Sequence, residues 1–285
     1  MSTTADAKQQ QPPRRIGHVL EGIDMKTLTP EGAEKVREAV LKYSVVVLPK
    51  QDLEEEDMAR IAELFGAPVD LPSEMAFGHQ AKSQPRVTVV SNMRPDGTII
   101  PNNKAAEYWH QDGNFWVAPR EYVMNFLYSV IVPEEGGDTG FADTVLALQQ
   151  MDPELRKELE GLQIEVDARK IPDFSSLKED DERFPVALHS IIFNHDESGI
   201  ESLYPGNGNV TIKGKTKEES RDIIGRVLAH LDREPYVYYH KWTKGDLVLW
   251  DNKTCMHRSM GGYGNHPRKL FRTQCFHHPN LRTQS

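Results

Sequence analysis

Cysteine is scarce in this 285-residue chain, which contains two, Cys255 and Cys275. Two thiols cannot build a disulfide framework, and they are too few for a cysteine-rich zinc site. We therefore expect a reducing, cytoplasmic location. Any metal that the chain binds has to rely on histidine and carboxylate ligands.

Long apolar runs and an excess of basic residues are also missing. No segment approaches about twenty uninterrupted apolar residues, so we expect no membrane span and no membrane partner. The formal net charge of −9 argues against nucleic acid as the main partner, because phosphate binding needs a basic surface. A strand-linked Gly-x-Gly-x-x-Gly is absent too, which excludes the common dinucleotide fingerprint.

The rest of the composition is that of a globular protein, with 38% hydrophobic residues. Residues 1–15 are polar, so we expect them to form a disordered tail. We expect residues 16–285 to form a single folded domain. β-Branched and aromatic runs separated by turn residues favour a closed sandwich or barrel, mainly β with flanking α-helices. The expected strands are 44–48, 86–91, 122–132, 236–242, 247–250 and 269–276.

Capping residues predict the helices. Thr29-Pro30 starts one, Asp52 with Glu55 resembles a capping box for a second, and Thr216 with Glu219 forms a capping box for the longest. Asp143 and Asp152 offer two further starts, the latter for a helix that runs toward Leu162. The aperiodic segment 171–184 is compatible with a solvated loop or with a mobile lid.

The first chemical signal is His110-Gln111-Asp112. In an extended segment, His110 and Asp112 point to the same face because side chains alternate with a period of two. An imidazole and a carboxylate on one face supply two of the three ligands of a non-heme iron(II) site, which uses two histidines and one carboxylate. His257 follows an apolar strand and the polar Asp251-Asn252 turn, so it can be the distant third ligand.

A second signal is the pair Arg268 and Arg272. With Leu270 they share one face of an apolar, strand-like segment. Arginine is suited to a bidentate grip on a carboxylate and stays charged when it is buried. The alternative is an exposed edge strand with both arginines in water, and the segment alone favours neither.

Together these motifs carry a resemblance. His110-x-Asp112, Gly136-Gly137-Asp138-Thr139, Trp250-Asp251-Asn252 with His257, and Arg268 occur in an order and at separations that resemble the taurine dioxygenase/TfdA family of iron(II)- and 2-oxoglutarate-dependent dioxygenases. The resemblance extends from about Gly17 to about Phe276. It implies a double-stranded β-helix (jelly-roll) core and a homo-oligomer.

The resemblance also implies roles for individual residues. His110, Asp112 and His257 would hold Fe(II), and Arg268 with Thr139 would bind 2-oxoglutarate, the co-substrate that reacts with O2. Arg272 would meet an anionic substrate or the co-substrate itself. A carboxylate at Asp112, where related halogenases have a small residue, favours hydroxylation, desaturation or cyclisation of a small carboxylic, amino or sulfonic acid, with release of succinate and CO2.

Several neighbouring residues are less informative. Tyr108 could reach the same cavity and contact the substrate, and Cys255 is expected to be a small buried residue. The pair His277-His278 is expected to be solvated and without a role. His79, His189 and His195 have no spacing that identifies a partner.

Two alternatives belong to other functional classes. One is a non-catalytic jelly-roll protein that binds a metal or a small molecule, although the full ligand set with Arg268 speaks against it. The other is a zinc hydrolase, which would need a general base beside the metal-bound water. Oxygen dependence and succinate release would separate the oxygenase from both.

Overall fold

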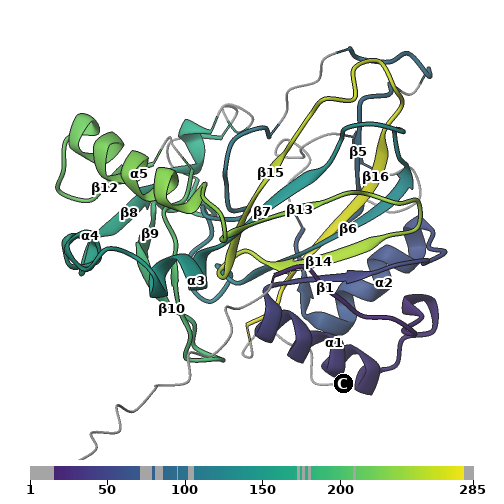
Figure 1. Ribbon diagram of the computed structural model, residues 1–285, viewed down its shortest axis with the longest axis horizontal. Coiled ribbons are helices and arrows are strands. Elements are labelled where there is room, and N and C mark those ends of the chain that lie inside the picture. The colour runs from purple at the N-terminus through teal and green to yellow at the C-terminus, as the bar shows by residue number, and fades with distance from the viewer. Residues whose placement is uncertain are drawn as a thin grey trace, which may run out of the picture.

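Two sheets facing each other dominate the computed structural model (Figure 1). It describes residues 16–70, 79–80, 86–94, 96–101, 106–171, 174, 177–178, 181–207 and 210–278. The expected tail at 1–15 and parts of the 171–184 segment lie outside the described residues. Among the described residues, no helix is both long and apolar enough to cross a bilayer.

The main sheet has the strand order β1-β2-β14-β6-β16-β5-β4, and β3 pairs with β16. Its strands are β1 (His18–Val19), β2 (Val45–Leu48), β3 (Ala67–Pro68), β4 (His79–Gln80), β5 (Thr88–Ser91), β6 (Val123–Ile131), β14 (Leu247–Asp251) and β16 (Lys269–Phe276). The facing sheet consists of β13 (Val237–His240), β7 (Thr139–Asp143) and β15 (Cys255–Ser259). The strands predicted from composition are therefore confirmed, with ends that differ by a few residues.

Successive side chains along each strand of the main sheet point to opposite faces, and each face packs into a different hydrophobic core. Side chains on its outer face pack with α1 (Pro30–Tyr43) and α2 (Glu55–Phe65), which lie together at the purple end of the chain in Figure 1. Side chains on its inner face, among them Val47, Leu127 and Trp250, pack against Phe141 and Cys255 of the facing sheet. Burial of both faces explains why β2 and β14 are continuous apolar runs.

A third core joins the remaining elements, which lie on the left of Figure 1. It contains α3 (Thr144–Gln149), α4 (Pro153–Leu159), α5 (Lys217–Leu231), the small sheet of β8 (Gln163–Val166), β9 (Ala187–Ser190) and β12 (Thr211–Ile212), and the pair β10 (Ile192–Asn194) and β11 (Glu201–Leu203). This group packs beside the end of the sandwich that carries His110 and Asp112.

The helix starts were predicted correctly except one. Thr29 caps α1, Thr216 and Glu219 form the capping box of α5, and Asp143 and Asp152 cap α3 and α4. The capping box of α2, however, is formed by Glu54 and Asp57, two residues later than the expected Asp52 and Glu55. Helix α4 also ends before Leu162, because Gly161 turns the chain at a φ of +73°.

Candidate metal centre and co-substrate pocket

His110 and His257 are held opposite each other by the backbone. His110 N–H donates to His257 O and His257 N–H donates to His110 O, each at 3.0 Å. A pair that exchanges both hydrogen bonds sends its side chains to the same side. The imidazole centroids are 4.1 Å apart. The distant histidine is thus placed beside the His-x-Asp motif by direct strand pairing.

Asp112 completes a cluster of three ligand atoms. Its Oδ1 lies 3.9 Å from His110 Nε2, and its Oδ2 lies 3.7 Å from His257 Nε2. Potential ligand atoms of the three residues all lie within 4.8 Å of one another. Two histidines and a carboxylate at this spacing fit a divalent transition metal bound on one side, with the other side open.

Hydrogen bonding, burial and charge prepare the cluster to bind a metal. His110 Nδ1–H donates to the carbonyl of Tyr108 at 2.8 Å, which leaves the Nε2 lone pair facing the cluster. Burial lowers the pKa of His257 to about 3, so its ring is neutral. Burial by itself would raise the pKa of Asp112, but the charge of Arg272, together with the two histidines and the hydrogen bond from Asn125, lowers it to about 2.

A cavity on one side of the cluster contains the residues expected for the co-substrate. It is lined by His257, Thr139, Arg268 and, on the same strand, Leu270 and Arg272. Arg268, which directly precedes β16, therefore lies on the same face as Leu270 and Arg272 of that strand, as the alternation of side chains predicted. Arg268 is 7% exposed, and none of the ion pairs found among the described residues includes it. A buried guanidinium of this kind is suited to a carboxylate ligand.

The Gly136-Gly137 turn shapes this pocket. Both glycines adopt a positive φ, and a Cβ on Gly137 would lie 3.1 Å from Arg268 Nε. Gly137 O accepts hydrogen bonds from Arg268 Nε at 3.2 Å and from Nη2 at 3.1 Å. Thr139 Oγ1 accepts from Trp242 Nε1 at 3.0 Å. The turn thus fixes one edge of the guanidinium, while the threonine hydroxyl lines the same cavity.

A second cavity opens on the other side of the cluster. Its lining is more aromatic and includes Phe115, Trp116 and Tyr108, with Tyr108 57% exposed at its edge. Among the described lining residues, three belong to both cavities: His110, Asp112 and Arg272. Two of the candidate metal ligands, His110 and Asp112, therefore lie between the two cavities, while His257 lines only the first.

Arg272 pairs with a protein carboxylate, the side chain of Asp112. Its Nη1 lies 3.5 Å from Asp112 Oδ2, and its side chain is 16% exposed. Because it lines both cavities, the geometry also leaves it within reach of an anion on either side.

Comparison with known proteins identifies the family. The model of the family "Taurine catabolism dioxygenase TauD, TfdA family" matches residues 7–274. This chain belongs to the TauD/TfdA family. The resemblance drawn from the motifs is therefore confirmed, and so is the jelly-roll fold.

Characterised relatives share the co-substrate. The chain is 29% identical over 267 residues to the (S)-phenoxypropionate/α-ketoglutarate dioxygenase of Sphingobium herbicidovorans, covering 86% of each chain. It is 29% identical over 263 residues to the α-ketoglutarate-dependent 2,4-dichlorophenoxyacetate dioxygenase of Cupriavidus pinatubonensis, covering 84% of this chain and 87% of the relative. The crystal structure of AAD-2 with Mn(II) and N-oxalylglycine superposes with a TM-score of 0.76 at 27% identity, covering 93% of this chain and 96% of that one.

These matches settle the class of protein. The chain is an α-ketoglutarate-dependent (2-oxoglutarate-dependent) dioxygenase, an oxidoreductase that works with a metal. The two alternatives, a non-catalytic binding protein and a zinc hydrolase, are wrong.

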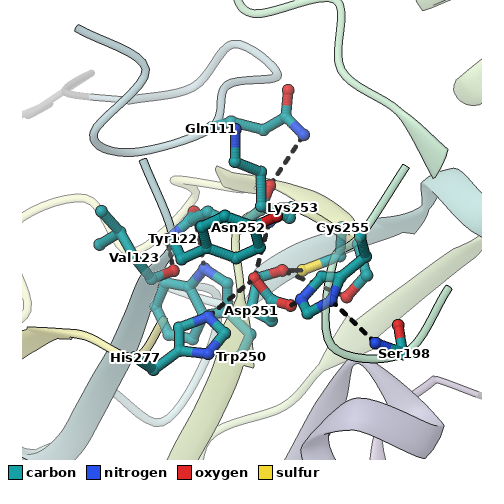
Figure 2. A network of polar contacts seen from close by, with 12 residues as sticks. Gln111, Tyr122, Val123, Ser198, Trp250, Asp251, Asn252, Lys253, Cys255 and His277 are labelled. Carbon is teal, nitrogen blue, oxygen red and sulfur yellow. Dashed lines mark hydrogen bonds and ion pairs between the residues drawn. The ribbon is translucent and has the colours of Figure 1, made fainter. Parts of the chain in front are cut away.

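In this dioxygenase, the turn that follows β14 holds the His-x-Asp segment in place (Figure 2). Asn252 Oδ1 accepts from the backbone N–H of Asp112 at 3.1 Å, and Asn252 O accepts from Gln111 Nε2 at 2.8 Å. The side-chain amide of Asn252 also donates to Val123 O at 2.9 Å. One buried asparagine therefore ties the motif to β6 and to the turn that leads to His257.

Beneath this turn lies a second cluster of two histidines and a carboxylate. Asp251 Oδ2 lies 3.1 Å from His195 Nε2, and Asp251 Oδ1 lies 3.3 Å from His277 Nε2. The expectation that His277-His278 is a solvated pair is wrong: the two residues are 0% and 8% exposed. The reason is that β16 ends at Phe276 and carries the next residues under the turn rather than to the surface.

Hydrogen bonding explains this cluster better than metal binding. Ser198 N–H donates to His195 Nδ1 at 3.4 Å, which places the ring proton on Nε2, where it meets Asp251. The backbone N–H of Lys253 also donates to Asp251 Oδ1 at 2.8 Å. The cluster therefore acts as a brace for the turn, and the histidines help to hold the pKa of Asp251 well below its usual range despite burial.

The same turn buries a lysine among aromatic rings. Lys253 Nζ lies 3.7 Å from the ring centroid of Tyr204 and 4.0 Å from that of Phe193, and the residue is 0% exposed. Burial lowers the pKa of Lys253 to about 8. Cation–π contacts compensate only part of the loss of hydration.

Replacing Lys253 with methionine is expected to flatten the pH dependence of stability in alkaline solution. Between about pH 8 and 10.5 the unfolded wild-type chain binds a proton that the folded chain does not, so its unfolding free energy rises with pH by up to about 3 kcal/mol. Chemical denaturation of both proteins from about pH 7.5 to about pH 10 measures this. The unfolding free energy of the variant minus that of the wild type should fall as pH rises. A difference that does not change with pH would contradict the assignment.

Sequence reasoning missed two residues that contact Asp112. Asn125 Nδ2 donates to Asp112 Oδ2 at 3.0 Å, and Gln274 Nε2 donates to the same atom at 3.3 Å. Each is an amide in a strand whose neighbours are mostly apolar, and this is the signal that could have singled them out.

Proposed function

We propose that His110, Asp112 and His257 bind Fe(II), and that the enzyme hydroxylates a small anionic molecule. A substrate C–H bond becomes C–OH while 2-oxoglutarate is converted to succinate and CO2, and each of the two oxidised products takes one oxygen atom of O2. When bound, the metal supplies the oxidising chemistry. The protein supplies two shaped cavities, ligand orientation and charge.

The observation that carries this proposal is the pair of cavities that meet at His110 and Asp112, with His257 lining the first of them. Arg268 and Thr139 give the first cavity the donors that a distal carboxylate of 2-oxoglutarate requires. The second cavity, with Phe115, Trp116 and Tyr108, gives the substrate an aromatic wall beside His110 and Asp112. Such a division lets both molecules reach the same metal from different sides.

Arg272 is the group that we assign to the anion of the substrate. One arginine is enough for the distal carboxylate of 2-oxoglutarate, because the other end of that molecule would chelate the metal. Arg272 lines the aromatic cavity as well, so its charge can be met there. Relatives that act on phenoxypropionate and 2,4-dichlorophenoxyacetate make an aryloxy carboxylic acid the first substrate class to test.

Arg272→Gln is expected to abolish product formation while 2-oxoglutarate still decays without substrate. The first measurement is substrate-dependent product by mass spectrometry, across aryloxy, amino and sulfonic acids. The second is succinate released with no substrate present. Equal loss of both activities would overturn the substrate role and assign Arg272 to the co-substrate.

We further propose that the enzyme acts as a homo-oligomer in the cytoplasm, with neither nucleic acid nor membrane as a partner. The acidic net charge supports the absence of a nucleic-acid partner. Light scattering of the purified protein tests the oligomeric state.

A further inference from the structure

We propose that Asn125 and Gln274 are positioning residues that hold one oxygen of Asp112, so that its other oxygen is presented to the metal. This inference rests on the proposed metal triad. It concerns two side chains that contact the ligand Asp112 and that neither the motifs nor the comparisons assign.

The two amides converge on a single atom. Asp112 Oδ2 accepts from Asn125 Nδ2 at 3.0 Å and from Gln274 Nε2 at 3.3 Å. The amides are also bonded to each other, since Gln274 Nε2 donates to Asn125 Oδ1. Turning either amide around would set a carbonyl oxygen against a carboxylate, so the network fixes both orientations. Neither amide bond goes to Oδ1, which lies 3.9 Å from His110 Nε2, whereas Oδ2 accepts both and also lies 3.7 Å from His257 Nε2.

Strand register explains why the amides meet. Asn125 and Gln274 are directly opposite each other in the antiparallel pair of β6 and β16. Both therefore project from the inner face of the main sheet, where Leu127 and Leu270 continue as apolar residues toward the other end. The polar side chains Asn125 and Gln274 occupy the part of this face that contacts Asp112.

Burial makes a purely incidental role costly. Asn125 is 0% exposed on the central strand β6, between Trp250 of β14 and Gln274 of β16. An amide in such a position destabilises the fold unless its hydrogen bonds are made. An apolar side chain would fill the same position in the sheet without needing any hydrogen bond. The bonds that Asn125 makes lead to Asp112 and to the amide beside it.

The amides also free Asp112 from dependence on Arg272. The guanidinium lies farther from Oδ2, at 3.5 Å, and it lines both cavities. If Arg272 turns to an anionic ligand, two neutral donors remain on Oδ2. A carboxylate held in this way binds through one oxygen, whereas chelation through both would take a further position on the ion.

Metal binding to the metal-free protein tests this without any turnover. Gln274→Met keeps the length of a half-buried side chain and removes its donor, and Asn125→Ala removes the buried one. Mn(II) is titrated into each apoprotein, and free Mn(II) is followed by electron paramagnetic resonance. We expect each variant to weaken Mn(II) binding roughly 10- to 100-fold, the usual effect of losing a contact to a metal ligand.

Thr273→Val is the matched control. Thr273 neighbours Gln274 on β16, is 2% exposed and donates to Arg86 O at 3.2 Å, away from Asp112. It should bind Mn(II) as the wild type does. Thermal unfolding of the apoproteins separates positioning from folding: Gln274→Met should unfold near the wild-type temperature. Unchanged Mn(II) affinity in Gln274→Met would overturn the inference, and so would a loss of affinity matched by Thr273→Val.

Failure of this inference can be told from failure of the triad. If His257→Ala loses Mn(II) while Gln274→Met keeps it, the triad stands and the positioning role is wrong. If His257→Ala itself binds Mn(II) normally, the proposed metal site is wrong.

Discussion

Replacing His257 with alanine is expected to abolish iron binding and succinate release together. The side chain supplies one of three proposed ligand atoms, is 8% exposed and is neutral at pH 7 because burial lowers its pKa to about 3. Loss of a direct ligand should exceed the roughly 10- to 100-fold loss of affinity expected for an outer contact. Anaerobic equilibrium dialysis measures iron per chain, which should fall from one toward none.

His230→Ala is a suitable control for this experiment. His230 is also a buried histidine, 6% exposed, and its Nε2 contacts Ala147 O at 2.8 Å in the third core, away from the triad. The control variant should keep one iron per chain. Retention of iron and turnover in His257→Ala would refute the assignment of this ligand.

Arg268→Ala is expected to weaken 2-oxoglutarate binding by about two to four powers of ten. Its guanidinium is buried, and burial lowers its pKa without making it neutral at physiological pH. Removing one half of a buried charged pair costs about 3–5 kcal/mol, because the carboxylate left behind is desolvated and unpaired. The apparent affinity for 2-oxoglutarate, from succinate release against its concentration, measures this effect.

Arg268→Lys separates charge from shape. Lysine keeps the positive charge but cannot donate two parallel hydrogen bonds, nor can it keep both contacts to Gly137 O. The affinity of Arg268→Lys for 2-oxoglutarate should therefore fall as well. Arg226→Ala removes an exposed arginine paired with Glu158 and should have no effect. Unchanged affinity in Arg268→Ala would transfer the role to Arg272.

Short-range patterns made much of the fold and part of the site predictable. The His110-x-Asp112 spacing predicts that both side chains lie on one side of the chain, and they do, although Asp112 begins a turn rather than continuing an extended segment. Cap residues such as Thr29 and Thr216 likewise act within one turn of helix. These features follow from covalent geometry and local hydrogen bonds.

Contacts set by strand register could not be predicted in the same way. The pairing of Asn125 with Gln274 joins residues 149 positions apart, and nothing local to either one fixes that register. The burial of His277 under Asp251 depends on where β16 ends relative to the turn after β14. Both errors concern polar residues whose partners lie on distant strands.

The shared wall between the two cavities has a thermodynamic consequence. Arg272 and Asp112 contribute charge to both spaces, so an anion that binds in one changes the field felt in the other. Whatever factor the substrate applies to the affinity for 2-oxoglutarate, the co-substrate must apply to the affinity for the substrate. The two molecules are therefore linked by a coupling free energy to which this ion pair contributes, and measuring one affinity in the presence of the other molecule gives its size.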